Sequence, residues 1–210
     1  MKCIKNEYTE VLKNTVRDQQ TNDKLLTKSL YSLGAEIGKY ILEEYLIKKK
    51  EINTPMNVTY LGTYVEEKNI VVISTKDDYE FFGNGIASLF TSVSRGYIEF
   101  NGDRGEAALK NTCRSMSMPD NSNVDMVIIA KSVIATGCTA ITLAKKAYEK
   151  YNPEYLVIVG AFYSDRGVKE LRDSCRNAII ISVGDPDELR SDGMLVPGVG
   201  NLDERIKKVV

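Results

Sequence analysis

The sequence predicts an α/β fold with a mostly parallel, five-stranded sheet and helices on both of its faces. Short apolar runs alternate with helical patterns after Gly62. Strands that are buried on both faces are apolar throughout, and the runs found here have this composition. The 210 residues are enough for one such domain and a small appendage.

An N-terminal arm is expected before the sheet. After an N-cap at Thr21-Asn22, apolar residues recur at helical spacing from Leu25 to Leu46, and Lys48–Lys50 suit the negative end of a helix. The pattern predicts one long amphipathic helix whose apolar stripe packs in the core or in a dimer seam. Alternating segments around Ile52 and Val58–Leu61 predict a small hairpin.

Strands and helices alternate in the rest of the chain. Strands are predicted at residues 69–74, 96–100, 125–130, 155–162 and 177–184. Helices are predicted at residues 80–90, 139–150 and 165–175. Residues 101–123 are polar and have no periodicity, which indicates a long loop whose role the sequence leaves open.

The composition excludes several classes of function. With 28 basic and 29 acidic residues, the chain has no general attraction to nucleic acid or to an anionic membrane. It has no histidine, which excludes Ser-His and Cys-His nucleophilic systems, and no metal site is expected. Four scattered cysteines, a polar N-terminus and the lack of a membrane-length apolar run predict a cytoplasmic protein with free thiols.

A turn of small residues lies between the third predicted strand and its helix. Its residues are Ala135, Thr136, Gly137, Cys138 and Thr139. Ligands of open α/β sheets bind at the carboxyl ends of the strands, where the N–H groups of a helix start favour an anion. The turn is therefore a candidate phosphate-binding loop. The motif alone leaves open an ordinary turn in which Thr139 caps the helix.

Two other stretches are candidates for binding. The segment Ser191–Arg205 contains three glycines and a proline, which leave backbone groups accessible to a flat ring. Its composition also fits a terminal loop that lies on the surface. The cluster Lys76-Asp77-Asp78 follows the first predicted core strand, and its composition favours a solvated loop.

Taken together, these stretches resemble the uracil phosphoribosyltransferase family, particularly its archaeal members. The family's phosphate loop, D-P-M-x-A-T-G-G-S, corresponds to Lys131–Thr139. The family's uracil loop, G-Y-I-V-P-G-L-G-D-A-G-D-R, corresponds to Gly193–Arg205. Other matches at family spacing lie in the N-terminal half, at Arg17-Asp18, Thr21, Leu33-Gly34 and Thr54-Pro55.

The resemblance covers essentially the whole chain and implies a type I phosphoribosyltransferase fold. It divides the chain into an N-terminal helical arm with a hood hairpin (1–62), a core (63–190) and a C-terminal pyrimidine-binding loop of the hood (191–210). It also implies a homodimer or a higher homo-oligomer. The implied pyrimidine-binding residues are Met194, Leu195, Val196, Gly198, Gly200 and Asn201.

The departures from the family pattern fall on the pyrophosphate side of the implied site. The family's pyrophosphate-binding arginine aligns with Asp77, and the acidic residue that holds the ribose hydroxyls aligns with Lys131. The aspartate near the metal and the pyrophosphate aligns with Asn201. No catalytic residue is assigned with these positions replaced. Arg104 and Lys76 are the possible substitutes for the missing cations.

These replacements decide the functional expectation. Two unit charges ~4 Å apart interact by about 4 kcal/mol at an effective dielectric constant of 20, so exchanging an arginine for an aspartate turns attraction into repulsion. The expected protein is a divergent uracil phosphoribosyltransferase homologue that binds UMP or a related pyrimidine nucleotide with weak or no transferase activity. The alternative is an active enzyme of pyrimidine salvage with a rearranged pyrophosphate site. That enzyme would make UMP and pyrophosphate from uracil and phosphoribosyl pyrophosphate, with Mg²⁺ as its cofactor.

Overall fold

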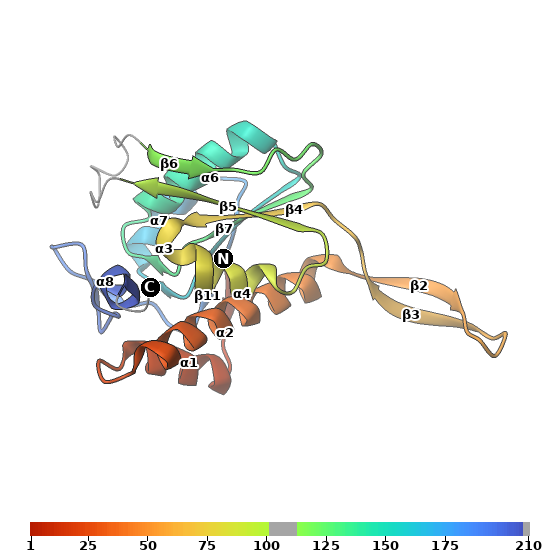
Figure 1. Cartoon of the computed structure of the whole chain (residues 1–210), viewed down its shortest axis with the longest axis horizontal. Coiled ribbons are helices and arrows are strands. Elements are labelled where there is room, and N and C mark those ends of the chain that lie inside the picture. Colours follow the sequence, from red (N-terminus) through yellow and green to blue (C-terminus); the bar gives the residue numbers. More distant parts are fainter. Residues whose placement is uncertain (101–112, 208–210) are drawn as a thin grey trace.

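The computed structural model describes residues 1–100 and 113–207, and a seven-stranded sheet forms its centre (Figure 1). All neighbouring strands are parallel except the last pair, β5 and β6. The order across the sheet is β1 (Lys2–Ile4), β11 (Ile179–Val183), β9 (Tyr155–Gly160), β7 (Met126–Ala130), β4 (Ile70–Thr75), β5 (Val93–Phe100) and β6 (Cys113–Ser117). The predicted α/β class and the mostly parallel sheet are confirmed.

The sheet is larger than the five predicted strands because β1 and β6 extend its two edges. Both are short segments without an apolar run, so backbone pairing rather than burial makes them strands. Residues 113–117 had been predicted as part of a long loop, and that prediction is wrong for β6. The rest of that loop, residues 101–112, lies outside the described residues.

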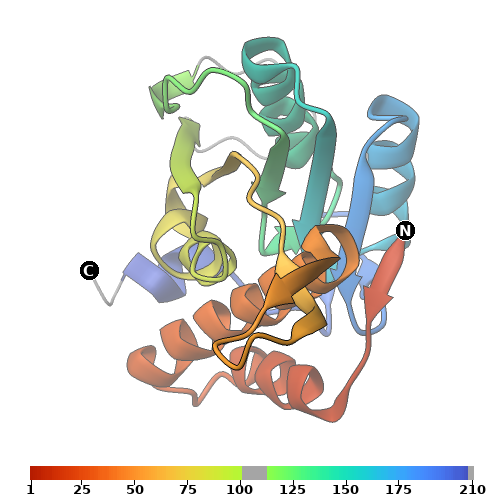
Figure 2. The same ribbon diagram turned by 90° about the vertical axis from the view of Figure 1, so that its right-hand side faces the viewer.

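Helices cover both faces of the sheet, because alternate residues of each buried strand point to opposite sides. One face packs against α1 (Glu7–Arg17) and α2 (Asp23–Ile41), which Figure 2 shows in red and orange below the strands. The other face packs against α6 (Cys138–Tyr151) and α7 (Asp165–Ser174). The apolar stripe of α2 is thus core, since Leu33 and Ile37 are fully buried within this single chain.

A third helical segment follows β4 and crosses α2 at close range. It consists of α3 (Lys76–Asp78), η2 (Tyr79–Gly83) and α4 (Asn84–Ala87). A Cβ added to Gly34 would lie 2.2 Å from the carbonyl oxygen of Phe82, and one added to Gly85 would lie 2.0 Å from that of Tyr31. Glycines in these helices therefore allow the close crossing. The crossing in turn determines where the segment that follows β4 lies.

The cluster Lys76-Asp77-Asp78 forms the first turn of this helical segment. The prediction of a solvated loop is wrong, because the helix begins directly after β4 rather than at residue 80. Asp78 is only 3% exposed. The backbone therefore places Asp78 in the interior at the carboxyl end of β4.

A long hairpin, β2 (Ile47–Asn53) and β3 (Thr59–Val65), projects from the body of the molecule (Figure 1). The π-helical turn η1 (Leu42–Leu46) ends the helical path, and Lys48–Lys50 pair with β3 instead of closing a helix. The hairpin lies at the opposite end of the molecule from α8 (Leu202–Lys207). Within this single chain the hairpin and the C-terminal segment are therefore far apart, whereas the family resemblance implies that both belong to one hood.

The C-terminal segment is folded against the core rather than frayed. Two residue pairs join β12 (Glu188–Leu189) to β13 (Leu195–Val196), and α8 follows. Leu195 and Val199 are buried in the cluster that α1 and α2 also line. None of the helices in the described part of the chain is long and apolar enough to cross a membrane.

Candidate functional site

The turn Ala135–Thr139 leads from the carboxyl end of β7 into α6. Between them, β8 (Val133–Ile134) pairs with β10 (Phe162–Tyr163) and holds the approach to the turn. Gly137 is the N-cap of α6 at φ +83°, and a Cβ there would lie 2.8 Å from the carbonyl oxygen of Gly167. No side chain of the described residues caps the start of α6. Its first N–H groups are thus available to an anion.

The serine that caps the start of α7 contacts this turn. The Ser164 hydroxyl donates a hydrogen bond to the carbonyl oxygen of Ala135 at 2.5 Å and accepts one from the N–H of Gly167 at 2.9 Å. The alternative in which Thr139 caps the helix does not hold, since α6 already begins at Cys138. These contacts hold the turn in place at the start of α6.

A buried ion pair lies at the ends of the two neighbouring strands β4 and β7. Ser74 and Ala130 are register partners near these ends, which brings the following residues together. Lys131 Nζ lies 2.5 Å from Asp78 Oδ2, and the two side chains are 15% and 4% exposed. The hydroxyl of Thr75 donates a second hydrogen bond to the same carboxylate oxygen at 3.0 Å. The position expected to hold ribose hydroxyls thus carries an ammonium already bonded within the protein.

Of the two possible substitutes for the missing cations, Lys76 forms an ion pair with a different carboxylate. Lys76 is 56% exposed and lies 3.4 Å from Glu99 on β5. The hydroxyl of Ser115 donates to Glu99 at 2.7 Å, and this hydrogen bond, followed by Lys76, lowers the pKa of the Glu99 carboxyl. Arg104 lies outside the described residues. Asp77, aligned with the family's arginine, is half-buried in the first turn of α3.

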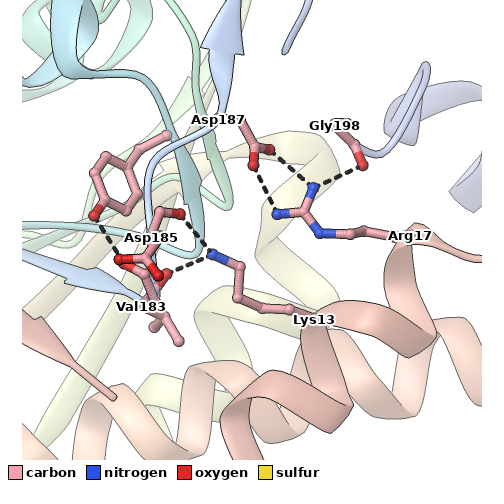
Figure 3. A network of polar contacts seen from close by, with 8 residues as sticks. Lys13, Arg17, Val183, Asp185, Asp187 and Gly198 are labelled. Atoms are coloured by element: carbon pink, nitrogen blue, oxygen red, sulfur yellow. Dashed lines mark hydrogen bonds and ion pairs between the residues drawn. The ribbon is translucent and has the colours of Figure 1, made fainter. Parts of the chain in front are cut away.

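The C-terminal loop is fastened to α1 by two arginines. Arg17 makes a bidentate contact with Asp187, at 3.0 and 2.7 Å, and donates to the carbonyl oxygen of Gly198 at 3.1 Å (Figure 3). Arg205 donates to the carbonyl oxygens of Val16 at 2.6 Å and Val199 at 3.0 Å. These contacts hold the loop against α1, although five residues of the loop itself are glycine, proline or asparagine.

The six residues implied to bind a pyrimidine divide by exposure. Leu195 is 7% exposed and packs in the core, whereas its neighbour Val196 is 41% exposed. The Gly198 carbonyl is bonded to Arg17, and a Cβ added at Gly200 would meet no atom within 4 Å. The carbonyl of Asn201 accepts from the N–H of Arg205 at the start of α8. Both views place this region on the same side of the molecule as α3.

A buried lysine beside Arg17 was not predicted from the sequence. Lys13 is 5% exposed, and its ammonium donates to the carbonyl oxygens of Val183 at 2.5 Å and Asp185 at 3.4 Å (Figure 3). Burial, followed by the charge of Arg17, lowers the pKa of Lys13 to about 8. The signal was present, because residue 13 lies on the face of α1 that also carries Thr9 and Val16.

The lowered pKa of Lys13 predicts a rise in stability at alkaline pH. Between about pH 8 and 10.5 the folded lysine has lost its proton while the unfolded lysine keeps it. The unfolded state then binds more protons, so the free energy of unfolding increases with pH, by up to ~3 kcal/mol across this window. Urea unfolding of wild type and Lys13→Met at pH 7.5 and 10 isolates the effect. A stability difference that is independent of pH would contradict it.

Two other residues of this region, Thr75 and Asp187, also escaped prediction, and Asp78 was predicted only as part of a solvated loop. The roles of the two aspartates depend on partners far away in the sequence: Lys131 lies 53 residues from Asp78, and Arg17 lies 170 residues from Asp187. Thr75 contributes through its local hydrogen bond to Asp78. Within the described residues, no group of three acidic, cysteine or histidine side chains could hold a metal ion.

Comparison with known proteins places this geometry in a family. The family model described as uracil phosphoribosyltransferase matches residues 3–206. The uracil phosphoribosyltransferase of Haloarcula marismortui is 28% identical over 199 residues, which cover 90% of this chain and 88% of that protein. That of Natronomonas pharaonis is 27% identical over 198 residues, which cover 90% of this chain and 88% of that protein.

A solved structure shares the fold over nearly the whole length. The AQ2163 protein from Aquifex aeolicus superposes with a TM-score of 0.81 at 23% identity, covering 98% of this chain and 97% of that one. The family model spans both the phosphate turn and the C-terminal loop described above. The chain belongs to the uracil phosphoribosyltransferase family.

Proposed function

We propose that this protein is a divergent member of its family that binds UMP or a related pyrimidine nucleotide and has weak or no transferase activity. The observation that carries the proposal is the buried ion pair of Asp78 and Lys131. It occupies the ends of β4 and β7, next to the turn that offers N–H groups to a phosphate. Residues 191–207 are the proposed pyrimidine side of the site.

The ion pair works against the transfer reaction in two ways. The family resemblance implies a carboxylate at the position of Lys131 that holds the ribose hydroxyls, and an ammonium cannot accept hydrogen bonds. Asp77 and Asp78 also place two carboxyl groups after β4, where the family resemblance implies a cation for the pyrophosphate. Departure of pyrophosphate needs stabilisation of its developing charge, and this arrangement opposes it.

The features that suit a nucleotide product are retained. The turn Ala135–Thr139 keeps its glycine, its hydroxyls and the uncapped start of α6. The C-terminal loop keeps the glycines of the family pattern and is held in place by Arg17 and Arg205. A phosphate monoester with a pyrimidine base thus matches the residues better than a magnesium-bound pyrophosphate does.

Two measurements test the proposed function. Calorimetric titration with UMP is expected to show binding, and Thr136→Val is expected to weaken it about tenfold through loss of one hydroxyl donor. Ser88→Val, which changes a hydroxyl that donates to the carbonyl oxygen of Gly85 in α4, serves as the control. A single-turnover assay with labelled uracil, phosphoribosyl pyrophosphate and Mg²⁺ is expected to give UMP near background. Turnover at ~1 per second or faster would reject the proposal and favour the active enzyme.

We also propose that the protein is a cytoplasmic homodimer whose subunits meet through the β2–β3 hairpin. Nearly all residues of both strands are exposed in the single chain. Large apolar side chains are among them: Ile52, Tyr60, Leu61 and Tyr64. An exposed apolar hairpin that leaves the body of the molecule is suited to pair with a second copy.

Charged substitutions on the hairpin test whether it forms the dimer interface. The double variant Tyr60→Asp, Leu61→Asp is expected to be a monomer by light scattering at micromolar concentration, because it places two charges in the interface. Tyr8→Asp with Val11→Asp, an equally exposed apolar pair on α1, is the matched control and should stay dimeric. A wild-type monomer, or a dimer that survives the hairpin variant, would contradict the proposal.

A further inference from the structure

The ion pair of Asp78 and Lys131 joins the two segments that follow the neighbouring central strands β4 and β7. Asp78 belongs to the helical turn after β4, and Lys131 directly follows β7. Four residues beyond Lys131 the chain enters the turn Ala135–Thr139. Lys131 therefore leads from β7 toward the segment proposed to bind a phosphate, and a positive charge there would attract a phosphate group of a ligand.

The carboxylate cancels that charge. Lys131 Nζ lies 2.5 Å from Asp78 Oδ2, and the carboxylate is 4% exposed, so water screens the pair little. Thr75 Oγ1, 3.0 Å from the same oxygen, fixes the carboxylate in place. A phosphate on the turn is served by backbone N–H groups and does not need the ammonium. A second phosphate group placed toward β4 would face a neutral pair and the acidic residue Asp77.

We propose that Asp78, through its ion pair with Lys131, makes the site select a phosphate monoester and reject a ligand that carries an additional pyrophosphate group. Asp78 is thus a specificity-determining residue, because its carboxylate neutralises the charge of Lys131 that would otherwise attract a pyrophosphate group. The inference rests on the proposed function, because it takes the turn Ala135–Thr139 as the seat of the first phosphate.

Ribose 5-phosphate and phosphoribosyl pyrophosphate are the matched pair of probes, because they differ only by the pyrophosphate group. The measured quantity is the ratio of their dissociation constants, obtained by calorimetry without uracil. Asp78→Asn releases the Lys131 charge and is expected to shift the ratio at least tenfold toward phosphoribosyl pyrophosphate. Lys131→Gln leaves the carboxylate alone and is expected to shift the ratio in the opposite direction. The double variant Asp78→Asn, Lys131→Gln is expected to return it to the wild-type value.

A charge change elsewhere controls for net charge. Asp120→Asn breaks an exposed pair with Lys150, at 2.7 Å, and should leave the ratio unchanged. Should one single variant fail to fold, the remaining single variant and the neutral double variant still have a predicted order. The same ratio in every folded variant overturns the inference while leaving the proposed function intact. Failure of the wild-type protein to bind either ribose 5-phosphate or UMP overturns the proposed function itself.

Discussion

Replacing Arg17 with alanine is expected to lower the free energy of unfolding by about 3–5 kcal/mol, because it leaves the carboxylate of Asp187 buried without its cation. Asp187 is 3% exposed in its side chain, and both of its oxygens accept from Arg17. The guanidinium also lies 5.2 Å from the centre of the Phe162 ring, so the variant loses packing as well as charge.

The same variant is expected to weaken UMP binding. Arg17 donates to the carbonyl oxygen of Gly198, so its loss frees the loop proposed to hold the pyrimidine. Ordering a freed loop on binding costs affinity, and a tenfold loss corresponds to ~1.4 kcal/mol. Urea unfolding and calorimetry measure the two effects separately.

A nearby exposed pair provides the control for Arg17. Lys5 and Asp185 form an ion pair whose side chains are 60% and 81% exposed. Water already solvates both groups, so Lys5→Ala should leave the unfolding midpoint and the UMP affinity unchanged. If Arg17→Ala and Lys5→Ala lowered the free energy of unfolding equally, burial of Asp187 would not explain the loss of stability.

Removing Asp78 is expected to have a comparably large effect on stability. Asp78→Ala leaves the ammonium of Lys131 in a site where its side chain is 15% exposed, and such a loss of one partner typically costs about 3–5 kcal/mol. Adding Lys131→Met to Asp78→Ala removes the stranded charge and supplies apolar contact. The double variant is therefore expected to recover most of the lost stability.

A double-mutant cycle in urea measures this coupling directly. The two single variants and the double variant are compared with wild type under identical salt. Additive effects of the two substitutions would mean that the side chains do not interact in the folded protein. A strong coupling, with the double variant more stable than Asp78→Ala alone, is the expected result.

Much of the fold was predictable because its signals are local. The apolar runs at residues 125–130 and 155–162 contain strands that pair as β7 and β9, and the N-cap Asn22 starts α2 as predicted. The edge strand β1 was not predictable from its own three residues. Its strand conformation comes from pairing with β11, and only the folded sheet supplies that partner.

In the candidate site, too, local features were predictable and contacts between distant residues were not. The turn Ala135–Thr139 and the C-terminal glycines follow from spacing along the chain. The partner of Lys131 does not, because Asp78 lies 53 residues away and its own neighbours suggest a solvated acidic loop. The family resemblance implies that an acidic residue is replaced by Lys131. The structure adds that the ammonium of Lys131 is paired with Asp78, in the helical turn after the neighbouring strand β4.

The pairing of β1 with β11 has a consequence for the order in which the chain folds during synthesis. Lys2 pairs opposite Ile181, and the contact of Arg205 with the Val16 carbonyl spans 189 residues. Translation at ~5–20 residues per second takes roughly 9–36 s to span the first of these separations. Throughout that interval β1 has no sheet edge to pair with, so its backbone N–H and C=O groups are open to water and to other chains. A premature stop before β11 would leave β1 unpaired for as long as the fragment lasts.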